Sequence, residues 1–129
     1  MHRKLLILGS VSGFLAVILG AFASHGLEKV LSVSELSTFE VGIRYQFYHT
    51  LLAILCGSIS ALSEKSKNTI FYLILIGVIL FSGSIYGLAT NILSVFDFKT
   101  IAWLTPVGGI FLISSWLVLF FNVLKMKKK

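Results

Sequence analysis

VGIRYQFYHTLLAILCGSISAL, residues 41–62, places an arginine, a glutamine, two tyrosines and a histidine directly before a long apolar run. In a water-soluble domain, apolar and polar positions alternate along each element, whereas here they are separated into blocks. Lipid offers no hydrogen-bond partners, so polar side chains at membrane depth must face protein or water. The stretch therefore predicts a membrane-crossing helix near residues 46–63 with its polar residues gathered at one end.

The composition of the whole chain places it in the membrane class. Of its 129 residues 57% are hydrophobic and 12% charged, against roughly half and a quarter in soluble domains. Four apolar runs approach the length of about 20 residues that a hydrocarbon core requires. We therefore predict an all-α integral membrane protein, a single domain over residues 1–129, with four transmembrane helices in an up-down bundle. The predicted spans lie near residues 5–24, 46–63, 69–91 and 101–124.

The first run also has the features of a signal peptide. Arg3 and Lys4 precede an apolar stretch that ends in small residues near Ala23, which is typical of a cleavage site. The run is, however, longer than a usual signal core, and its small residues suit a retained packing helix. A retained first span is the preferred interpretation.

The basic residues predict the orientation of the chain. With the N-terminus inside, eight of the eleven lysines and arginines fall on the cytoplasmic side, which places both termini there in a multi-pass protein of the cell membrane. The net charge of +6 then indicates contact with anionic lipid, not with nucleic acid. Each lysine of the tail KMKKK, residues 125–129, contributes on the order of 1 kcal/mol at anionic headgroups.

The segment 25–45 between the first two spans is amphipathic and is predicted to lie at the membrane interface as short helical turns. Two S-x-x-E patterns in it, Ser32 with Glu35 and Ser37 with Glu40, have the form of capping boxes. The second lies nearer the apolar run. We therefore predict that the second helix begins near Thr38.

Polar residues of three spans and of the external segment are expected to gather toward the outer leaflet. In the structural interpretation, Glu40 is a cap, Arg44 pairs with Glu40, and the tyrosines lie at the interface. His49 reaches into a buried hydrogen-bond network with His25 or with hydroxyls of the third and fourth spans. A role in binding a ligand or moving a proton is the alternative. The predicted cluster comprises His25, Glu40, Arg44, Tyr45, Tyr48, His49, Ser82, Ser84 and Thr105.

Small residues predict close helix packing. GSVSG at 9–13 and GSIYG at 83–87 are both GxxxG motifs, which let helix backbones approach closely in lipid. Thr105 and Pro106 have the form of an N-cap followed by a first helical residue, unless the helix begins earlier and Pro106 kinks it. The predicted packing glycines are Gly9, Gly13, Gly20, Gly83, Gly87, Gly108 and Gly109.

Four ordered segments carry a resemblance to a known family. GAFASHGL at 20–27, EVGIRYQFYH at 40–49, LFSGSIYGLA at 80–89 and LTPVGGIFLISSW at 104–116 resemble segments of the membrane proteins grouped as domain of unknown function 423, or UPF0382, which include transmembrane protein 256. Members read GAFGAH where this chain has Ala23 and Ser24 before His25. The resemblance implies a four-span protein of the inner or plasma membrane, and it implies no activity.

Three classes of function are open to such a chain. The preferred one is a non-enzymatic packing or accessory module, acting as a homo-oligomer or beside another membrane protein. The alternative is transport of a proton, an ion or a small solute along the polar cluster. An enzyme is not expected, because the HExxH, GxSxG and phosphate-loop patterns are absent from the sequence. No catalytic residue, metal site or cofactor is predicted.

Overall fold

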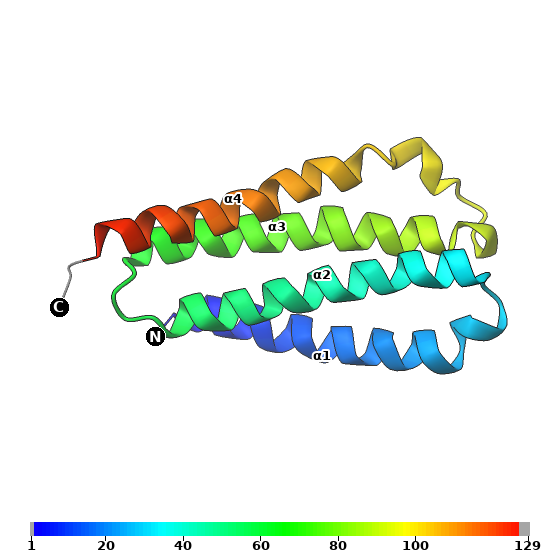
Figure 1. Ribbon diagram of the computed structural model, residues 1–129, viewed down its shortest axis with the longest axis horizontal. Helices are drawn as coiled ribbons and strands as arrows, with labels where there is room; N and C mark the ends of the chain where they lie inside the picture. The colour runs from blue at the N-terminus through cyan, green and yellow to red at the C-terminus, as the bar shows by residue number, and fades with distance from the viewer. Residues whose placement is uncertain (1, 127–129) are drawn as a thin grey trace.

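The computed structural model describes residues 2–126, and its described residues form helices joined by short connections. The four α-helices are α1 (Arg3–His25), α2 (Val33–Ser58), α3 (Glu64–Ala89) and α4 (Leu104–Lys125). Short 3-10 helices lie in the connections: η1 (Leu27–Lys29), η2 (Asn91–Leu93) and η3 (Phe98–Ile101). Successive α-helices run in opposite directions, so that the start of α1 and the end of α4 lie at the same end of the molecule as the connection from α2 to α3 (Figure 1).

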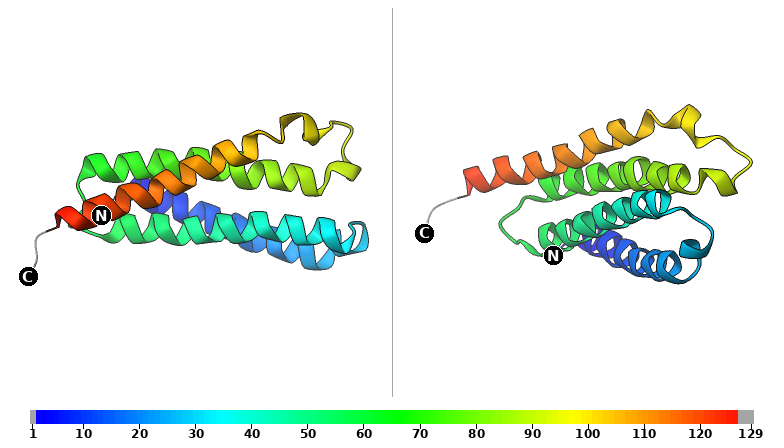
Figure 2. Two further views of the ribbon diagram at one scale, coloured as in Figure 1. Left: turned by 45° about the horizontal axis from the view of Figure 1, so that its top comes forward. Right: turned by 45° about the vertical axis from the view of Figure 1, so that its right-hand side comes forward.

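The four α-helices form a staggered row (Figures 1 and 2). Most contacts join helices that follow one another in the chain: α1 with α2, α2 with α3, and α3 with α4. In addition, α1 touches α3 along part of its length, and α2 reaches α4 through one side-chain hydrogen bond. The helices α1 and α4 stand at opposite ends of this row. The helices alternate in direction as predicted, but they lie side by side in a row instead of closing into a compact bundle. No other described helix covers the two faces of this row.

The apolar core is divided between the two ends of the row. Near the termini, Leu5 of α1, Leu52 of α2 and Ile70 of α3 belong to one cluster of fully buried side chains. At the other end Phe39 and Ala89 lie in a second cluster. Between the clusters, α2 and α3 carry buried polar side chains, and their contacts with the neighbouring helices form the candidate site.

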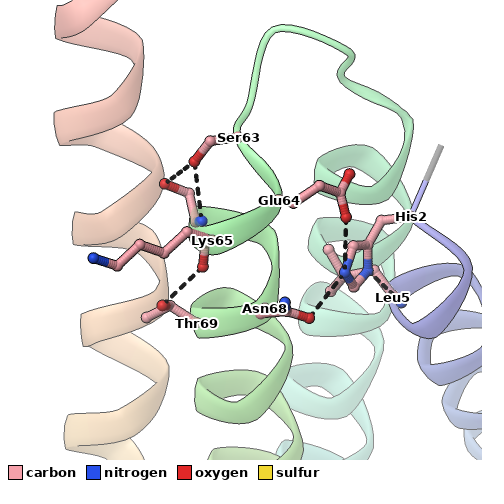
Figure 3. A network of polar contacts seen from close by, with 8 residues as sticks. His2, Leu5, Ser63, Glu64, Lys65, Asn68 and Thr69 are labelled. Carbon is pink, nitrogen blue, oxygen red and sulfur yellow. Dashed lines mark hydrogen bonds and ion pairs between the residues drawn. The ribbon is translucent and has the colours of Figure 1, made fainter.

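His2 joins three helices at the end of the row where the chain begins (Figure 3). Its backbone N–H donates to the carbonyl of Gly57 at 2.9 Å, and its Nδ1 accepts from the N–H of Leu5 at 3.3 Å. Since Nδ1 accepts, the ring proton lies on Nε2, which donates to Oδ1 of Asn68 at 3.1 Å. The carboxylate of Glu64 lies 3.6 Å from the same nitrogen. The start of α1 is thereby tied to the end of α2 and the start of α3.

Three helical segments are long and apolar enough to cross a membrane. They are residues Arg3–Lys29, Glu64–Ala89 and Leu104–Lys125. Among the described residues α2 does not meet the same criterion, and its first half carries Arg44, Gln46 and His49. Length and composition thus support the membrane class through α1, α3 and α4.

The structure corrects the prediction for the first external connection. The helix α2 begins at Val33, because Ser32 and Glu35 form a capping box in which Glu35 N–H donates to Oγ of Ser32 at 3.1 Å and Ser32 N–H to Oε1 of Glu35 at 2.8 Å. The predicted start near Thr38 was wrong, and Ser37 lies inside the helix. Most of the segment 25–45 is therefore part of α2, and only residues 26–32 connect it to α1.

The connections to α3 and α4 also differ from the prediction. The turn before α3 occupies residues 59–63, and α3 already begins at Glu64, capped by Ser63. The helix α4 begins at Leu104, so Thr105 is not its N-cap and Pro106 lies within its first turn. Proline lacks a backbone N–H, but the first N–H groups of a helix have no partner within it. Pro106 therefore breaks no hydrogen bond of α4 and does not kink it. Of the basic tail, Lys125 ends α4, and residues 127–129 lie outside the described residues.

Candidate functional site

One face of α2 carries the polar side chains of the candidate site. Gly42, Gln46 and His49 follow one another at spacings of four and three residues, which places them on the same side of an α-helix. All three are buried, with only 5% of Gln46 and 4% of His49 exposed. A buried amide and a buried imidazole need hydrogen-bond partners. The neighbouring helices supply them.

Gln46 links α2 to the helices on both sides. Its amide nitrogen donates to the carbonyl of Ser12 in α1 at 2.8 Å, and its carbonyl oxygen accepts from the hydroxyl of Tyr86 in α3 at 2.5 Å. One helical turn before Tyr86, the hydroxyl of Ser82 donates to the carbonyl of Gly42 at 2.7 Å. Gln46 thus connects α2 to α1 and to α3, and the bond from Ser82 to Gly42 adds a second connection between α2 and α3.

His49 links α2 to α4. The indole nitrogen of Trp116 donates to Nε2 of His49 at 3.0 Å, and because an indole can only donate, Nε2 must carry the lone pair. The ring proton is then on Nδ1, which donates to the carbonyl of Tyr45 at 2.7 Å. Both nitrogens of the neutral ring are occupied. In this arrangement the imidazole has no free position for another ligand.

A third contact links α3 to α4. The hydroxyls of Ser84 and Thr105 lie 2.5 Å apart, and Ser84 also lies 2.9 Å from the carbonyl of Phe81. Together these groups form what we call the polar layer, in which every α-helix of the row takes part. Its members are Ser12, Gly42, Gln46, His49, Ser82, Ser84, Tyr86, Thr105 and Trp116.

A cavity of about 360 Å³ lies beside His49 between α2 and α4. Tyr45, Phe81 and Trp116 supply aromatic walls, and the backbone at Gly109 leaves room beside them. Since both His49 nitrogens are already bonded, the cavity offers mainly apolar and aromatic surface. Such a space accommodates a hydrocarbon group or a side chain from another helix better than a hydrated ion.

Several residues predicted for the polar cluster lie outside the polar layer. His25 ends α1 with its side chain exposed, and His49 bonds to Trp116 and to the Tyr45 carbonyl. Both predicted partners of His49, namely His25 and the hydroxyls of the third and fourth spans, were therefore wrong. Glu40 and Arg44 are both exposed, and within residues 2–126 no ion pair of 4.0 Å or less joins them. Their side chains therefore do not fasten α2 to its neighbours.

The predicted tyrosines lie at the edge of the polar layer. The ring of Tyr45 packs against Phe81 of α3 with centroids 5.0 Å apart, and against Tyr48 at 5.4 Å. Tyr45 is 40% and Tyr48 50% exposed, as expected of aromatic residues facing the membrane or its interface. His49, Ser82, Ser84 and Thr105 are the predicted cluster residues that the structure places within the polar layer.

The predicted packing glycines divide into two groups. A Cβ added at Gly9 would come within 2.5 Å of Ile54, one at Gly13 within 3.0 Å of Thr50, and one at Gly87 within 2.5 Å of Phe98. A Cβ at Gly108 would meet the backbone of α3, including the Leu80 carbonyl carbon at 2.8 Å. These four glycines permit close approach. At Gly109 the contact would be ordinary.

Gly20 and Gly83 behave differently. An added Cβ at either position would meet no described heavy atom within 4 Å. Within the described chain these two glycines therefore do not mediate helix contact. Gly42 and Gly77, which were not among the predicted glycines, do so, because a Cβ would lie 2.6 Å from Tyr86 at Gly42 and 2.6 Å from Leu112 at Gly77.

Gln46, Tyr86 and Trp116 belong to the polar layer but were missing from the predicted cluster. A spacing signal was available for the first two: Gln46 lies three residues before His49, and Tyr86 four residues after Ser82. Trp116 gave no such signal, because its partner lies 67 residues away. Within residues 2–126, no group of three His, Cys, Asp or Glu residues is placed to hold a metal ion.

Apolar helices of this length, joined by an internal layer of hydrogen bonds, define a small α-helical membrane protein. The chain belongs to the DUF423 family, whose description is "Protein of unknown function (DUF423)" and whose sequence model matches residues 19–109. The expected resemblance is thereby confirmed.

Relatives of nearly the same length support this assignment. The chain is 41% identical to a UPF0382 membrane protein of Haemophilus influenzae, with 98% of each chain covered. It is 34% identical to the UPF0382 inner membrane protein YgdD of Escherichia coli K12, with 98% of this chain and 94% of the relative covered. No solved structure matches the chain.

Proposed function

We propose that the chain is a four-span packing or accessory module that acts without a catalytic centre of its own. The observation that carries the proposal is the polar layer, because its side chains bond chiefly to one another and to backbone carbonyls. Gln46 binds Ser12 and Tyr86, and both His49 nitrogens are occupied. Polar groups used in this way hold helices together in lipid.

The proposal includes a membrane crossing by α2. Its 26 residues correspond to about 39 Å of helix, enough for a hydrocarbon core of about 30 Å. It lies between α1 and α3, both long and apolar enough to cross. Its amide and imidazole are buried against these helices and α4, so lipid does not meet them. This shielding supports a fourth span despite the polar residues of α2.

The row of helices supports a packing role because it leaves wide apolar faces uncovered. Phe14 and Val17 on α1 are 67% and 64% exposed, and Ile110 and Ile113 on α4 are 64% and 61% exposed. Lipid can cover such faces, and so can helices of a second copy or of another membrane protein. Contact between helices in lipid depends on close packing, which glycines with open space beside them, such as Gly20, would favour.

We further propose that both termini face the cytoplasm. The start of α1, the end of α4 and the connection 59–63 lie at one end of the row (Figure 1). Of the described basic residues, Arg3, Lys4, Lys65, Lys67 and Lys125 belong to these segments. An excess of basic residues marks the cytoplasmic side. The basic tail then lies against anionic headgroups, as the sequence suggests.

Transport along the polar cluster receives less support. A path for protons or ions needs polar groups with free hydrogen-bonding capacity or water between them. Within the polar layer His49 has none free, while the predicted members His25, Glu40 and Arg44 are exposed away from it. The transport reading would need these hydrogen bonds to open.

Crosslinking in native membranes tests the packing proposal. Single cysteines placed at exposed positions of α1 and α4, such as V17C and I113C, are oxidised in a Cys56→Ala background. We expect cysteines on one face of the row to give covalent dimers, or a disulfide-linked complex of fixed stoichiometry with another membrane protein. A cysteine at the exposed connection residue Glu28 serves as the control for random collisions.

Purely monomeric protein from native membranes, with every cysteine position crosslinking no better than the Glu28 control, would contradict the proposal. Proteoliposomes provide the complementary measurement. Flux of protons or of a small solute that disappears in His49→Ala would favour transport over packing.

A further inference from the structure

A groove runs along the membrane-embedded length of the row between α1 and α3, with α2 as its floor. It encloses about 440 Å³ and extends from Leu8 to Leu19 on α1. Apolar residues of both helices line most of its walls, Gln46 of α2 lies at its floor, and the walls carry the polar residues Ser12 of α1 and Ser82 and Tyr86 of α3. Gln46, Ser82 and Tyr86 already bond to one another or to neighbouring carbonyls, and the Ser12 hydroxyl, which has no partner among the described residues, is itself buried. The groove therefore presents mainly hydrocarbon to an occupant.

The dimensions of the groove favour an extended chain over a helix as its occupant. Eleven residues separate Leu8 from Leu19, which corresponds to about 16 Å along the helix axis. Division of the volume by this length gives a mean width of about 6 Å for the centre of a water molecule and about 9 Å between the walls, against about 10–12 Å for an α-helix with its side chains. A single extended hydrocarbon chain fits this width. Both α1 and α3 are apolar enough to lie in the bilayer, where such chains are the solvent.

The groove continues toward the end of the row where the chain begins. A second hollow of about 270 Å³ shares Leu8 and Val11 with it and reaches Lys4 and Phe71. The ammonium of Lys4 extends across from α1 and lies 5.9 Å from the ring centre of Phe71 and 5.8 Å from that of Tyr72. Cation–π contacts of this kind hold an ammonium group in place. A positive charge is thus fixed at the mouth of an apolar groove.

The charges at this end of the row are mostly positive. Arg3, Lys4 and Lys65 lie there with exposed side chains, while the carboxylate of Glu64 lies beside His2. The side chain of Lys4 is itself exposed. An anionic headgroup can therefore reach its ammonium from the membrane surface.

We propose that this groove binds one acyl chain of an anionic phospholipid whose phosphate lies at Lys4. The distance from Lys4 to Leu19 corresponds to about 22 Å of helix, long enough for most of an acyl chain lying along α1 and α3. Apolar walls favour the chain, and Lys4 distinguishes an anionic headgroup from a neutral one. The proposal rests only on α1 and α3 lying in the membrane, and not on the packing function proposed above.

Photolabelling of the full-length protein in vesicles tests the proposal. The probes are phosphatidylglycerol and phosphatidylcholine with the same diazirine-bearing acyl chain, each as a minor component of phosphatidylcholine vesicles. We expect labels on groove residues such as Val11, Leu15 and Ile79, and several-fold more label from the anionic probe. Positions are assigned by peptide mass spectrometry and compared with the exposed α4 residue Phe120.

Two pairs of variants separate the headgroup from the chain. Lys4→Gln should lower the preference for the anionic probe about fivefold, equivalent to about 1 kcal/mol for one basic residue at an anionic surface. Lys65→Gln, an exposed lysine at the same end, should leave it unchanged. Gly83→Leu should fill the groove and lower labelling by both probes, whereas Gly20→Leu, also at an open glycine but outside the groove, should not.

Equal labelling of the wild-type groove by both probes would overturn the proposal, as would an unchanged anionic preference in Lys4→Gln. Labelling of the groove no stronger than at Phe120 would do the same. If the groove excludes both probes while G83C forms disulfide-linked dimers, a second copy covers it and the lipid proposal fails. Because Lys4 is exposed, Lys4→Gln tests the headgroup contact even if Gly83→Leu does not fold.

Discussion

Trp116 donates a hydrogen bond to His49 across 3.0 Å, and this bond is the side-chain link between α2 and α4. It determines the tautomer of the imidazole, since Nε2 must accept and Nδ1 must carry the proton. His49 therefore serves as a bridge between the backbone of its own helix and a neighbouring helix. We propose that this residue, which most suggests proton chemistry in the sequence, has a structural role in the fold.

The hydroxyl of Tyr86 should stabilise the row through Gln46. Tyr86→Phe removes the donor 2.5 Å from Oε1 of Gln46 and leaves that oxygen buried without its partner, at a cost of about 1 kcal/mol. Tyr72→Phe is the matched control, because Tyr72 lies on the same helix, is 50% exposed and is not hydrogen-bonded within residues 2–126. Reversible unfolding in mixed micelles measures both, and equal stability of the two variants would refute the role of this bond.

Neighbouring glycines of α4 should respond differently to the same substitution. An added Cβ at Gly108 would strike the backbone of Leu80 and Phe81, which cannot move aside, whereas at Gly109 it would lie 3.7 Å from the Phe81 ring. We expect Gly108→Ala to destabilise the protein by about 1–3 kcal/mol and Gly109→Ala to have little effect. Thermal unfolding in nanodiscs gives the comparison. A harmless Gly108→Ala would mean that α3 and α4 are farther apart than described.

The two S-x-x-E patterns provide a test of where α2 begins. Ser32→Ala removes the cap that accepts from the Glu35 N–H and should cost about 1 kcal/mol. Ser37 lies inside the helix with its side chain exposed, so Ser37→Ala should be neutral or slightly stabilising, because alanine has the higher helix propensity. The unfolding free energies of the two variants show which serine caps α2. The reverse order of effects would restore the start near Thr38 that the sequence suggested.

The predicted membrane class and helical content follow directly from composition and run length, which are local properties. The start of α2 was mispredicted because Ser32 and Ser37 offer the same local capping chemistry. The choice between them depends on tertiary packing, since Phe39 is 3% exposed and packs against Tyr86 with ring centroids 4.9 Å apart. Leu36, which precedes Thr38, packs against the same buried cluster as Phe39, and a helix that begins before Thr38 places these two residues on one face.

The sequence could predict at which depth in the membrane the polar residues lie, but not which of them form hydrogen bonds with one another. Ser82, Ser84 and Thr105 were expected near His49 because helix rise places them toward the same side of the membrane. Which of them bond to one another depends on helix rotation and on the order of the helices in the row. The contact of His49 with Trp116 joins residues 67 positions apart, and a single sequence contains no information about that pairing.

A double-mutant cycle between His49 and Trp116, measured by reversible unfolding in a bilayer, tests most directly whether the polar layer holds the helices together. The single variants are His49→Phe and Trp116→Phe, and Trp103→Phe, at a tryptophan that is 61% exposed, replaces Trp116→Phe in the control cycle. We predict a coupling of about 0.6–1.7 kcal/mol for His49 with Trp116 and none for His49 with Trp103. Zero coupling between His49 and Trp116 would contradict the account.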